Sequence, residues 1–179
     1  LRNLMYTAQL DSNELPFVIR YPRGEGVMPE WKTEMQEIKI GTGRKLKDGQ
    51  DIAILSFGHV GNFAASAIRD VKAEGINPAH YDMRFVKPLD EEMLHEVFSK
   101  YNKVITIEDG TVVGGFGSAI LEFMNEHGYK ADVKIMGIPD RLVEHGTPKQ
   151  LYDEIGIDAN GIADMLRVLS KINVAELIK

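Results

Sequence analysis

DIAILSFGHVGNFAASAIRDVKAEG, residues 51–75, holds a short apolar run and then a longer segment of helical pattern that stops at a glycine. A run of this length is typical of a buried strand, and a glycine commonly ends a helix. The same order of strand and helix recurs downstream. We expect strands at 79–86, 103–108 and 133–138, and helices at 90–101, 118–128, from Thr147 and near Asp158. This alternation predicts an α/β fold, with mostly parallel strands and helices on both faces.

The segment before this alternation adds an antiparallel element to the prediction. Residues 36–46 have an extended pattern and are followed by the turn residues Lys47, Asp48 and Gly49. An Asp-Gly pair between two extended runs is a strong hairpin signal. We therefore expect residues 36–46 to pair antiparallel with the strand that begins near residue 51.

The first 37 residues have a different pattern. Residues 1–10 place Leu1, Leu4 and Met5 on one face of a predicted helix, and the sequence starts at Leu1 as though within that helix. Residues 17–21 are β-rich and end at Pro22, which has no N–H for a strand ladder. Residues 25–37 are polar and without periodicity, as in an interdomain linker. We expect the opening residues to belong to a domain whose remainder lies upstream.

Composition excludes several classes of protein. The chain has 179 residues, of which 44% are hydrophobic, enough for one complete core. Its net charge of -6, without basic runs, disfavours nucleic acid and anionic membranes as partners. It has no cysteine, which excludes disulfides and thiolate chemistry and fits the cytoplasm. No apolar stretch approaches the ~20 residues of a membrane span.

Standard catalytic signatures are missing. None of the five histidines forms an H-x-x-x-H pair, no serine lies in G-x-S-x-G, and GTGRK at 41–45 is no phosphate loop. We therefore predict neither a catalytic residue nor a metal ligand in this chain.

One loop has the right place for a ligand. Residues 107–120, IEDGTVVGGFGSAI, lie between a strand and a helix, where open α/β sheets bind ligands. The simplest interpretation is that its glycines allow a tight turn and close helix packing. Glu108 and Asp109 are a functional acidic pair, solvated residues or subunit contacts, and the pattern does not decide between them.

Two arginines are candidates for binding an anion. Arg23 follows Pro22 and precedes Gly24 in FVIRYPRGEG, residues 17–26, so little backbone freedom remains before it. A guanidinium held in this way suits a phosphate, and a salt bridge is the equal alternative. For Arg84, in DMRFVKPLD (82–90), an ion pair with Asp82 or Asp109 is the plainer interpretation from the residues alone.

Seven blocks of the sequence span nearly the whole chain: LRNLMYTAQ, PFVIRYPRG, ILSFGHV, YDMRFVKPLDEEML, VITIEDGTVVGGFGSAI, IMGIPDRLVEHGTP and LYDEIGIDANGI. In this order they resemble the C-terminal portion of the 1-deoxy-D-xylulose-5-phosphate synthase family, thiamine diphosphate enzymes of the transketolase group. Together they are more specific than any single motif. The resemblance implies a three-layer α/β/α domain with a mixed, mostly parallel five-stranded sheet and one antiparallel edge strand.

The resemblance also implies an organisation. Residues 1–24 would end the pyrimidine-binding domain, 25–37 would be the linker, 38–170 the transketolase-type C-terminal domain and 171–179 a tail. The complete enzyme would be a homodimer that uses thiamine diphosphate and magnesium. The family's G-D-G motif and its activating glutamate are absent from this sequence. We therefore expect this chain to bind no cofactor, to be inactive alone, and to serve dimer contact and structural support.

The implied reaction joins pyruvate and glyceraldehyde 3-phosphate into 1-deoxy-D-xylulose 5-phosphate with loss of CO2, at the entry to the non-mevalonate isoprenoid pathway. Arg23 and, as a second assignment, Arg84 would bind the phosphate of glyceraldehyde 3-phosphate. This reverses the ion-pair interpretation of Arg84. The alternatives are the C-terminal domain of a transketolase or of a 2-oxoacid dehydrogenase beta subunit, or a non-catalytic interaction module. The runs RYPRG and GIPDRLVEHGTP favour the synthase.

Overall fold

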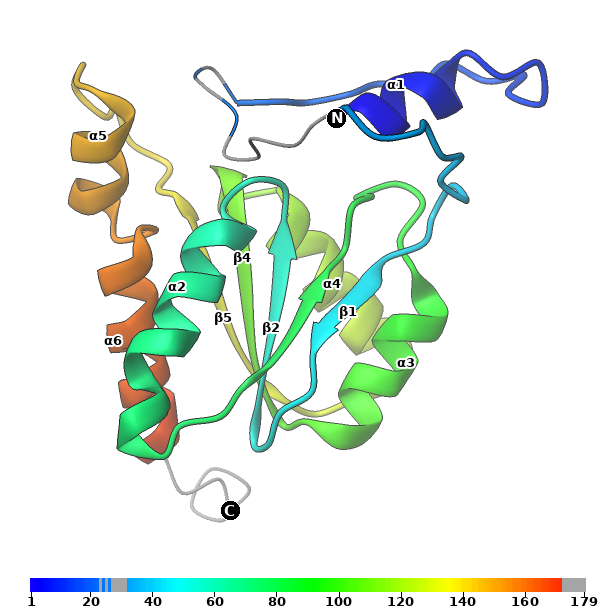
Figure 1. Ribbon diagram of the computed structural model, residues 1–179. Helices are drawn as coiled ribbons and strands as arrows, with labels where there is room; N and C mark the ends of the chain where they lie inside the picture. Colours follow the sequence, from blue (N-terminus) through cyan, green and yellow to red (C-terminus); the bar gives the residue numbers. More distant parts are fainter. Residues whose placement is uncertain (23, 25, 27–31, 172–179) are drawn as a thin grey trace.

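The computed structural model describes residues 1–22, 24, 26 and 32–171, which form a layered α/β domain with an N-terminal extension (Figure 1). Its centre is a five-stranded sheet of order β1-β3-β2-β4-β5. β1 is antiparallel to β3, and the other neighbours are parallel. The strands are β1 (Arg44–Lys47), β2 (Ile52–Phe57), β3 (Ala79–Asp82), β4 (Lys103–Thr111) and β5 (Asp132–Ile138). The predicted mixed sheet with one antiparallel edge strand is confirmed.

Helices cover both faces of this sheet (Figure 1), as predicted. α2 and α6 lie on one face, and α3 and α4 lie on the other. Asp90 caps α3 by accepting the N–H of Met93, and Thr147 begins α5 with a capping box to Gln150. The helices are α1 (Arg2–Ala8), α2 (Gly61–Val71), the short 3-10 helix η1 (Lys72–Glu74), α3 (Glu91–Lys100), α4 (Phe116–Glu126), α5 (Pro148–Ile155) and α6 (Ala159–Lys171).

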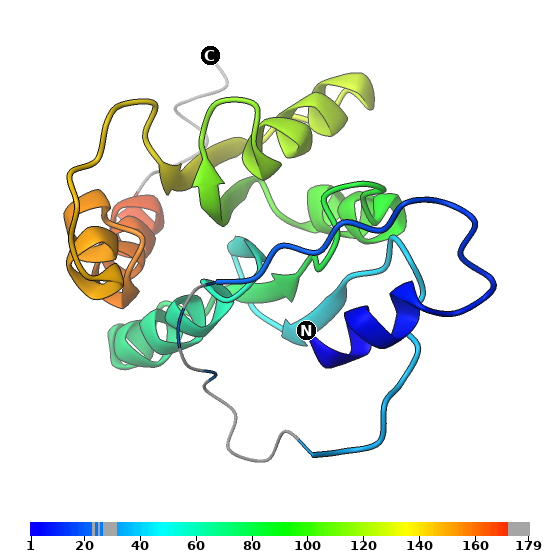
Figure 2. The ribbon, with the colours of Figure 1, turned by 90° about the horizontal axis from the view of Figure 1, so that it is seen from above.

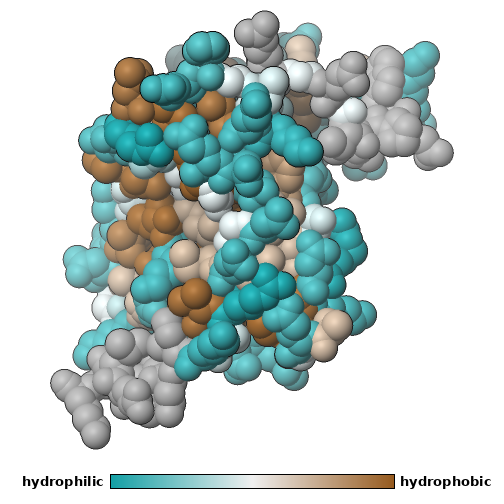
Figure 3. Space-filling model, turned by 90° about the vertical axis from the view of Figure 1, so that its left-hand side faces the viewer, coloured by the Kyte–Doolittle hydropathy of each residue, from teal (hydrophilic) through white to brown (hydrophobic). Residues whose placement is uncertain are grey.

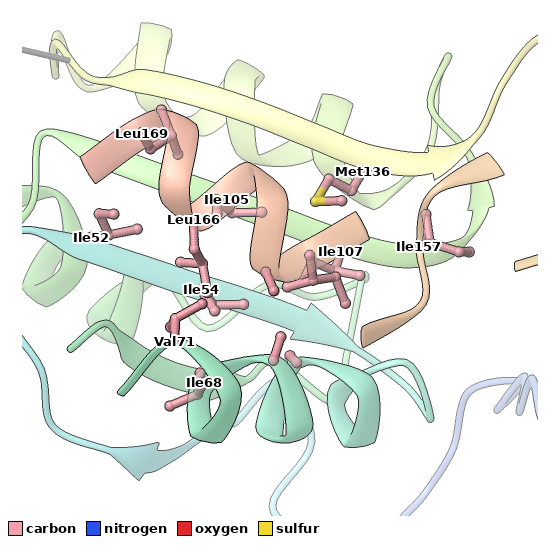
Figure 4. Packing of buried hydrophobic residues seen from close by; sticks show 14 of the residues in the cluster. Ile52, Ile54, Ile68, Val71, Ile105, Ile107, Met136, Ile157, Leu166 and Leu169 are labelled. Atoms are coloured by element: carbon pink, nitrogen blue, oxygen red, sulfur yellow. The ribbon is translucent and has the colours of Figure 1, made fainter. Parts of the chain in front are cut away.

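Two hydrophobic clusters hold the layers together. On one face, Ile54 and Ile105 of the central strands pack against Leu166 of α6, all with no exposed surface (Figure 4). On the other face, Tyr81 and Phe116 lie with α3 and α4 in the second cluster. Because β2 and β4 contribute to both clusters, their sequences are continuous apolar runs, which is usual for parallel strands buried on both sides.

The predicted hairpin is wrong, because β1 pairs with β3 and not with β2. The turn residues allow the chain to cross beneath β3 before it enters β2. A Cβ at Gly49 would lie 2.0 Å from the backbone nitrogen of Ala79, so only glycine fits this crossing. β1 is largely exposed, whereas β2 is buried on both faces, so their places in the sheet follow their hydrophobicity.

The predicted strand at 17–21 is not found, because these residues have no neighbouring strand to pair with. Residues 16–22, the crossing segment, run across the carboxyl ends of the parallel strands (Figures 1 and 2). The predicted strand at 79–86 is shorter than expected and ends at Asp82. Arg84 follows with φ of 54°, in the left-handed region, which cannot continue a strand.

The N-terminal extension contacts the domain at a few points. The hydroxyl of Thr7 in α1 accepts the N–H of Ile38 at 2.8 Å. The ring of Phe17 in the crossing segment meets that of Phe85 edge to face, with centroids 6.2 Å apart. Most of the extension is nevertheless solvated, and Val18 is 87% exposed. We expect so few contacts to add little to the stability of the domain.

The surface is mixed in character. On the side that faces left in Figure 1, hydrophilic side chains cover much of the area and hydrophobic residues show between them (Figure 3). Apolar exposure is high at the carboxyl edge, where the loops after β4 and β5 present Val113 and Leu142, 61% and 89% exposed. Among the described residues, no helix has the length and apolar character that crossing a membrane requires.

Candidate functional site

The candidate site lies at the carboxyl ends of β2 and β4. From β2 the chain continues to β3 on one side, and β4 lies on the other side, so the strand order reverses between β2 and β4. In open α/β sheets, ligands bind outside the carboxyl ends of strands at such a reversal. The segment 107–120, singled out by its sequence, contributes the end of β4 and the loop that leads into α4.

Glu108 is a buried carboxylate whose hydrogen bonds are to backbone groups of the same chain. The residue is only 2% exposed. Its two carboxylate oxygens accept hydrogen bonds from the backbone N–H groups of Phe116 and Gly117, at 3.0 and 2.9 Å. A negative charge is stabilised there by the unpaired N–H groups at the start of α4. A Cβ at Gly115 would lie 2.6 Å from a carboxylate oxygen of Glu108. The glycines therefore allow close packing, as predicted, and Glu108 is not a solvated loop residue.

Asp109 belongs to a cluster of half-buried polar side chains. Its carboxylate accepts the hydroxyl of Tyr152 at 3.1 Å, and the same hydroxyl lies 3.0 Å from Nε2 of His59. Burial, and then the charge of Asp109, raises the pKa of Tyr152 to about 12. Burial lowers the pKa of His59, and Asp109 opposes this effect. The Tyr152 hydroxyl donates its proton in a hydrogen bond to the Asp109 carboxylate. Its oxygen can therefore accept a hydrogen bond, and we assign the Nε2–H of a neutral His59 as the donor.

Arg20, the first arginine of RYPRG, joins the crossing segment to the end of β4. Its guanidinium donates to the backbone carbonyl of Asp109 at 2.5 Å. The next residue, Gly110, leaves room for it, because a Cβ there would lie 3.2 Å from Arg20 and 2.7 Å from Glu108 Oε2. One residue, Asp109, thus contacts α5 through its side chain and the crossing segment through its backbone.

Arg84 lies at the same edge, and its guanidinium serves the domain. Its Nε donates to the carbonyl of Thr42 at 2.8 Å, and one terminal nitrogen reaches the Thr42 hydroxyl at 3.0 Å and the Gly43 carbonyl at 2.7 Å. Burial lowers the pKa of Arg84. Asp82 pairs instead with the Arg44 side chain at 2.9 Å. The expected role of Arg84 at a substrate phosphate stays a prediction.

Arg23 lies outside the described residues, so its expected role also stays a prediction. The sequence analysis missed His59, Tyr152 and the contact of Arg20. His59 and Tyr152 are 93 residues apart. No local motif relates residues at such a distance, so only the fold brings them together.

The described residues do not fit the magnesium of the implied cofactor. They contain no group of three or more acidic, histidine or cysteine side chains placed to hold a metal ion. Both oxygens of Glu108 are bonded to backbone N–H groups, and Asp109 is bonded to Tyr152. EDG at 108–110 is therefore a structural element at the end of β4.

A cavity of about 450 Å³ opens at the opposite, amino edge of the sheet, near Asp51 and Asn77. Two of its charged groups already have partners: Glu74 pairs with Arg167 at 2.7 Å, and Lys103 donates to the Leu169 carbonyl at 2.9 Å. The geometry that favours a ligand site is at the carboxyl edge, so we place the candidate site there.

The fold defines a class of protein: three-layer α/β/α domains with a mixed sheet. In this chain, an N-terminal segment also crosses the carboxyl edge of that sheet. The family model for the transketolase C-terminal domain matches residues 41–162. The chain belongs to this family. A solved structure described as a split gene transketolase, an inactive beta4 tetramer, aligns with 75% of this chain and 44% of its own, with a TM-score of 0.69 and 31% identity. A Pichia stipitis transketolase shares the fold, with a TM-score of 0.52 and 17% identity over 72% of this chain and 18% of its own.

Matches to curated proteins point to one enzyme name within this family. This chain is 59% identical, over 96% of its length, to a protein of Cytophaga hutchinsonii named 1-deoxy-D-xylulose-5-phosphate synthase. It is 55% and 41% identical to proteins of the same name from Bacteroides thetaiotaomicron and Geobacillus thermodenitrificans, over 93% and 94% of its length. The chain spans about a quarter of the length of these relatives, 26% to 27%.

Proposed function

We propose that this chain forms the C-terminal part of a 1-deoxy-D-xylulose-5-phosphate synthase. The observation that carries the proposal is the 59% identity to a relative of that name over 96% of the chain. The complete enzyme would condense pyruvate with glyceraldehyde 3-phosphate and release CO2. Thiamine diphosphate, with magnesium, would supply the electron sink for decarboxylation, and upstream residues would bind it. This chain alone would be inactive.

Residues 38–170 would serve as a supporting domain, with 25–37 as linker and 1–24 as the end of the domain before it. The family match supports the bounds of this domain, because residues 41–162 fall within residues 38–170. The complete enzyme would be a cytoplasmic homodimer that uses small-molecule substrates and needs neither nucleic acid nor a membrane.

Arg23 would bind the phosphate of glyceraldehyde 3-phosphate. A guanidinium can give a phosphate two charge-assisted hydrogen bonds, and this would hold the acceptor aldehyde in one orientation for carbon–carbon bond formation. Its contribution is to binding and orientation, not to proton transfer. Arg84 is the second candidate for the same phosphate, although three of its donors already hold Thr42 and Gly43.

The test compares two acceptors in the complete enzyme: glyceraldehyde 3-phosphate and D-glyceraldehyde, which lacks the phosphate. We expect Arg23→Met to lower kcat/KM for the phosphorylated acceptor by about 10- to 100-fold, the effect of one charged hydrogen-bonding group. The effect on the other acceptor and on KM for pyruvate should be far smaller. Arg69→Met, at an exposed position on α2, is the matched control. Equal losses with both acceptors would contradict the assignment.

A further inference from the structure

We propose that His95 and His127 form a site for one divalent transition-metal ion, such as Zn²⁺, that joins α3 to α4. This inference does not rest on the proposed function. His95 lies in the middle of α3, and His127 directly follows α4. Both helices lie on the same face of the sheet (Figure 1). His127 follows the end of α4 that is remote from Glu108, so the pair is separate from the carboxyl-edge site.

The two rings use the same nitrogen, Nδ1, to bond to the protein. Nδ1 of His127 donates to the backbone carbonyl of Phe123 at 3.0 Å, so in the neutral ring the lone pair is on Nε2. Nδ1 of His95 lies 2.8 Å from the Tyr129 hydroxyl, and we assign it as the donor in the form that binds an ion. Among the described residues, neither Nε2 has a hydrogen-bond partner. Metal-binding histidines commonly donate their other ring N–H to an oxygen in this way.

The separation of the two rings fits two ligands of one ion. A Zn–N distance of about 2.0–2.1 Å and an angle of about 90–109° at the ion place two imidazole centroids about 4.5–5.2 Å apart. The observed centroids are 4.7 Å apart, with the ring planes at 85°. Edge-to-face packing of two rings spans about 4.5–7 Å, so the distance permits both arrangements. The hydrogen bonds at both Nδ1 atoms are what favour the ion.

Both rings are held in place by a buried neighbour. His127 stacks on Phe123 with centroids 4.2 Å apart, and Phe123 is only 5% exposed. His95 meets the same ring edge to face, with centroids 5.0 Å apart. Side chains that packing already orders lose less conformational entropy when they bind a ligand. The pair is therefore partly preorganised for an ion.

The position and the ligand type also define the ion. The last carbonyl groups of a helix carry the negative end of its dipole, and His127 lies immediately after α4, so a positive charge is favoured there. Imidazole nitrogen suits Zn²⁺, Ni²⁺ and Cu²⁺, whereas Mg²⁺ and Ca²⁺ require oxygen ligands. Water would fill the remaining coordination positions, which the exposure of His127 allows. The ion would therefore differ from the magnesium of the complete enzyme's cofactor.

Calorimetric titration of the metal-free 179-residue chain with Zn²⁺ tests the site. We expect one ion to bind per chain. His95→Gln and His127→Gln should each weaken this binding by at least about tenfold, because each removes a ligand. His145→Gln, at an exposed position before α5, is the matched control and should leave the affinity unchanged. No binding, or equal losses in all three variants, would overturn the proposal.

Two further measurements separate this site from ring packing alone. Tyr129→Phe removes the acceptor for the Nδ1–H of His95, so it should weaken Zn²⁺ binding about tenfold. Zn²⁺ should also raise the melting temperature of the unchanged chain and of His145→Gln, because an ion stabilises the folded state that binds it. It should not do so in His95→Gln or His127→Gln, and Mg²⁺ should have no effect on any of them. A shift that persists without either histidine, or no loss in Tyr129→Phe, would contradict the proposed ligands.

Discussion

The crossing segment and β2 share a high content of strand-forming residues but have different structures. Both are rich in strand-forming residues, yet β2 is a central strand with five buried residues, and the crossing segment is extended without a ladder. Ile54 has no exposed surface, whereas Val18 is 87% exposed. The difference shows that β propensity produces a strand only where a neighbouring edge can accept its hydrogen bonds.

The largest test of this contrast is a pair of truncated side chains. Ile54→Ala should lower the free energy of unfolding by about 3 to 4 kcal/mol, because it leaves a cavity in a closed cluster. Val18→Ala should change it by less than about 0.5 kcal/mol. Urea denaturation followed by circular dichroism measures both. Similar losses would mean that the crossing segment is packed as tightly as the sheet.

Acid should destabilise the domain through a buried histidine, a residue type that the extension lacks. His80 in β3 is buried against the Ser56 hydroxyl at 2.9 Å, and burial, opposed by Asp82, lowers its pKa to about 4. The unfolded chain therefore takes up this proton first, so the stabilisation is complete above about pH 6.5 and is lost as the pH falls toward 4. The first 37 residues contain no histidine.

The measurement for His80 is urea denaturation at pH 7 and pH 4.5. Relative to His80→Gln, the unchanged chain should lose about 2 kcal/mol more between these two pH values. Groups elsewhere titrate in both proteins and cancel in the comparison. The same loss in both would show that His80 does not carry this pH dependence.

Removing residues 1–37 should destabilise the domain less than either Ile54→Ala or acid. Few contacts are lost, chiefly Thr7 with Ile38, Phe17 with Phe85 and Arg20 with Asp109. The remaining domain should fold alone and be less stable by only about 1 kcal/mol, since these contacts are exposed or isolated. Calorimetry of both chains measures this difference. A fall of several kcal/mol would show that the extension and the domain unfold as one unit.

The sequence predicted the layers because their signals are local. The apolar runs of β2 and β4, the cap at Asp90 and the capping box at Thr147 each specify an element within a few residues. Local signals could not identify the strand that pairs with β1. Asp48 and Gly49 permit several paths, and the close approach of Gly49 to Ala79 depends on a strand 30 residues away.

The site was only partly predictable for the same reason. The segment 107–120 was identified from its place between strand and helix, but the use of Glu108 by its own helix depends on three-dimensional packing. The cluster of His59, Asp109 and Tyr152 joins three elements. Its members are ordinary residues in the sequence, and no spacing relates them.

Asp109 connects the two extremes of the described chain. Through Tyr152 it contacts one of the last helices, and through Arg20 it contacts a stretch near the beginning. A substitution in α5 that removes the Tyr152 hydroxyl would therefore disturb the same residue that the N-terminal extension contacts.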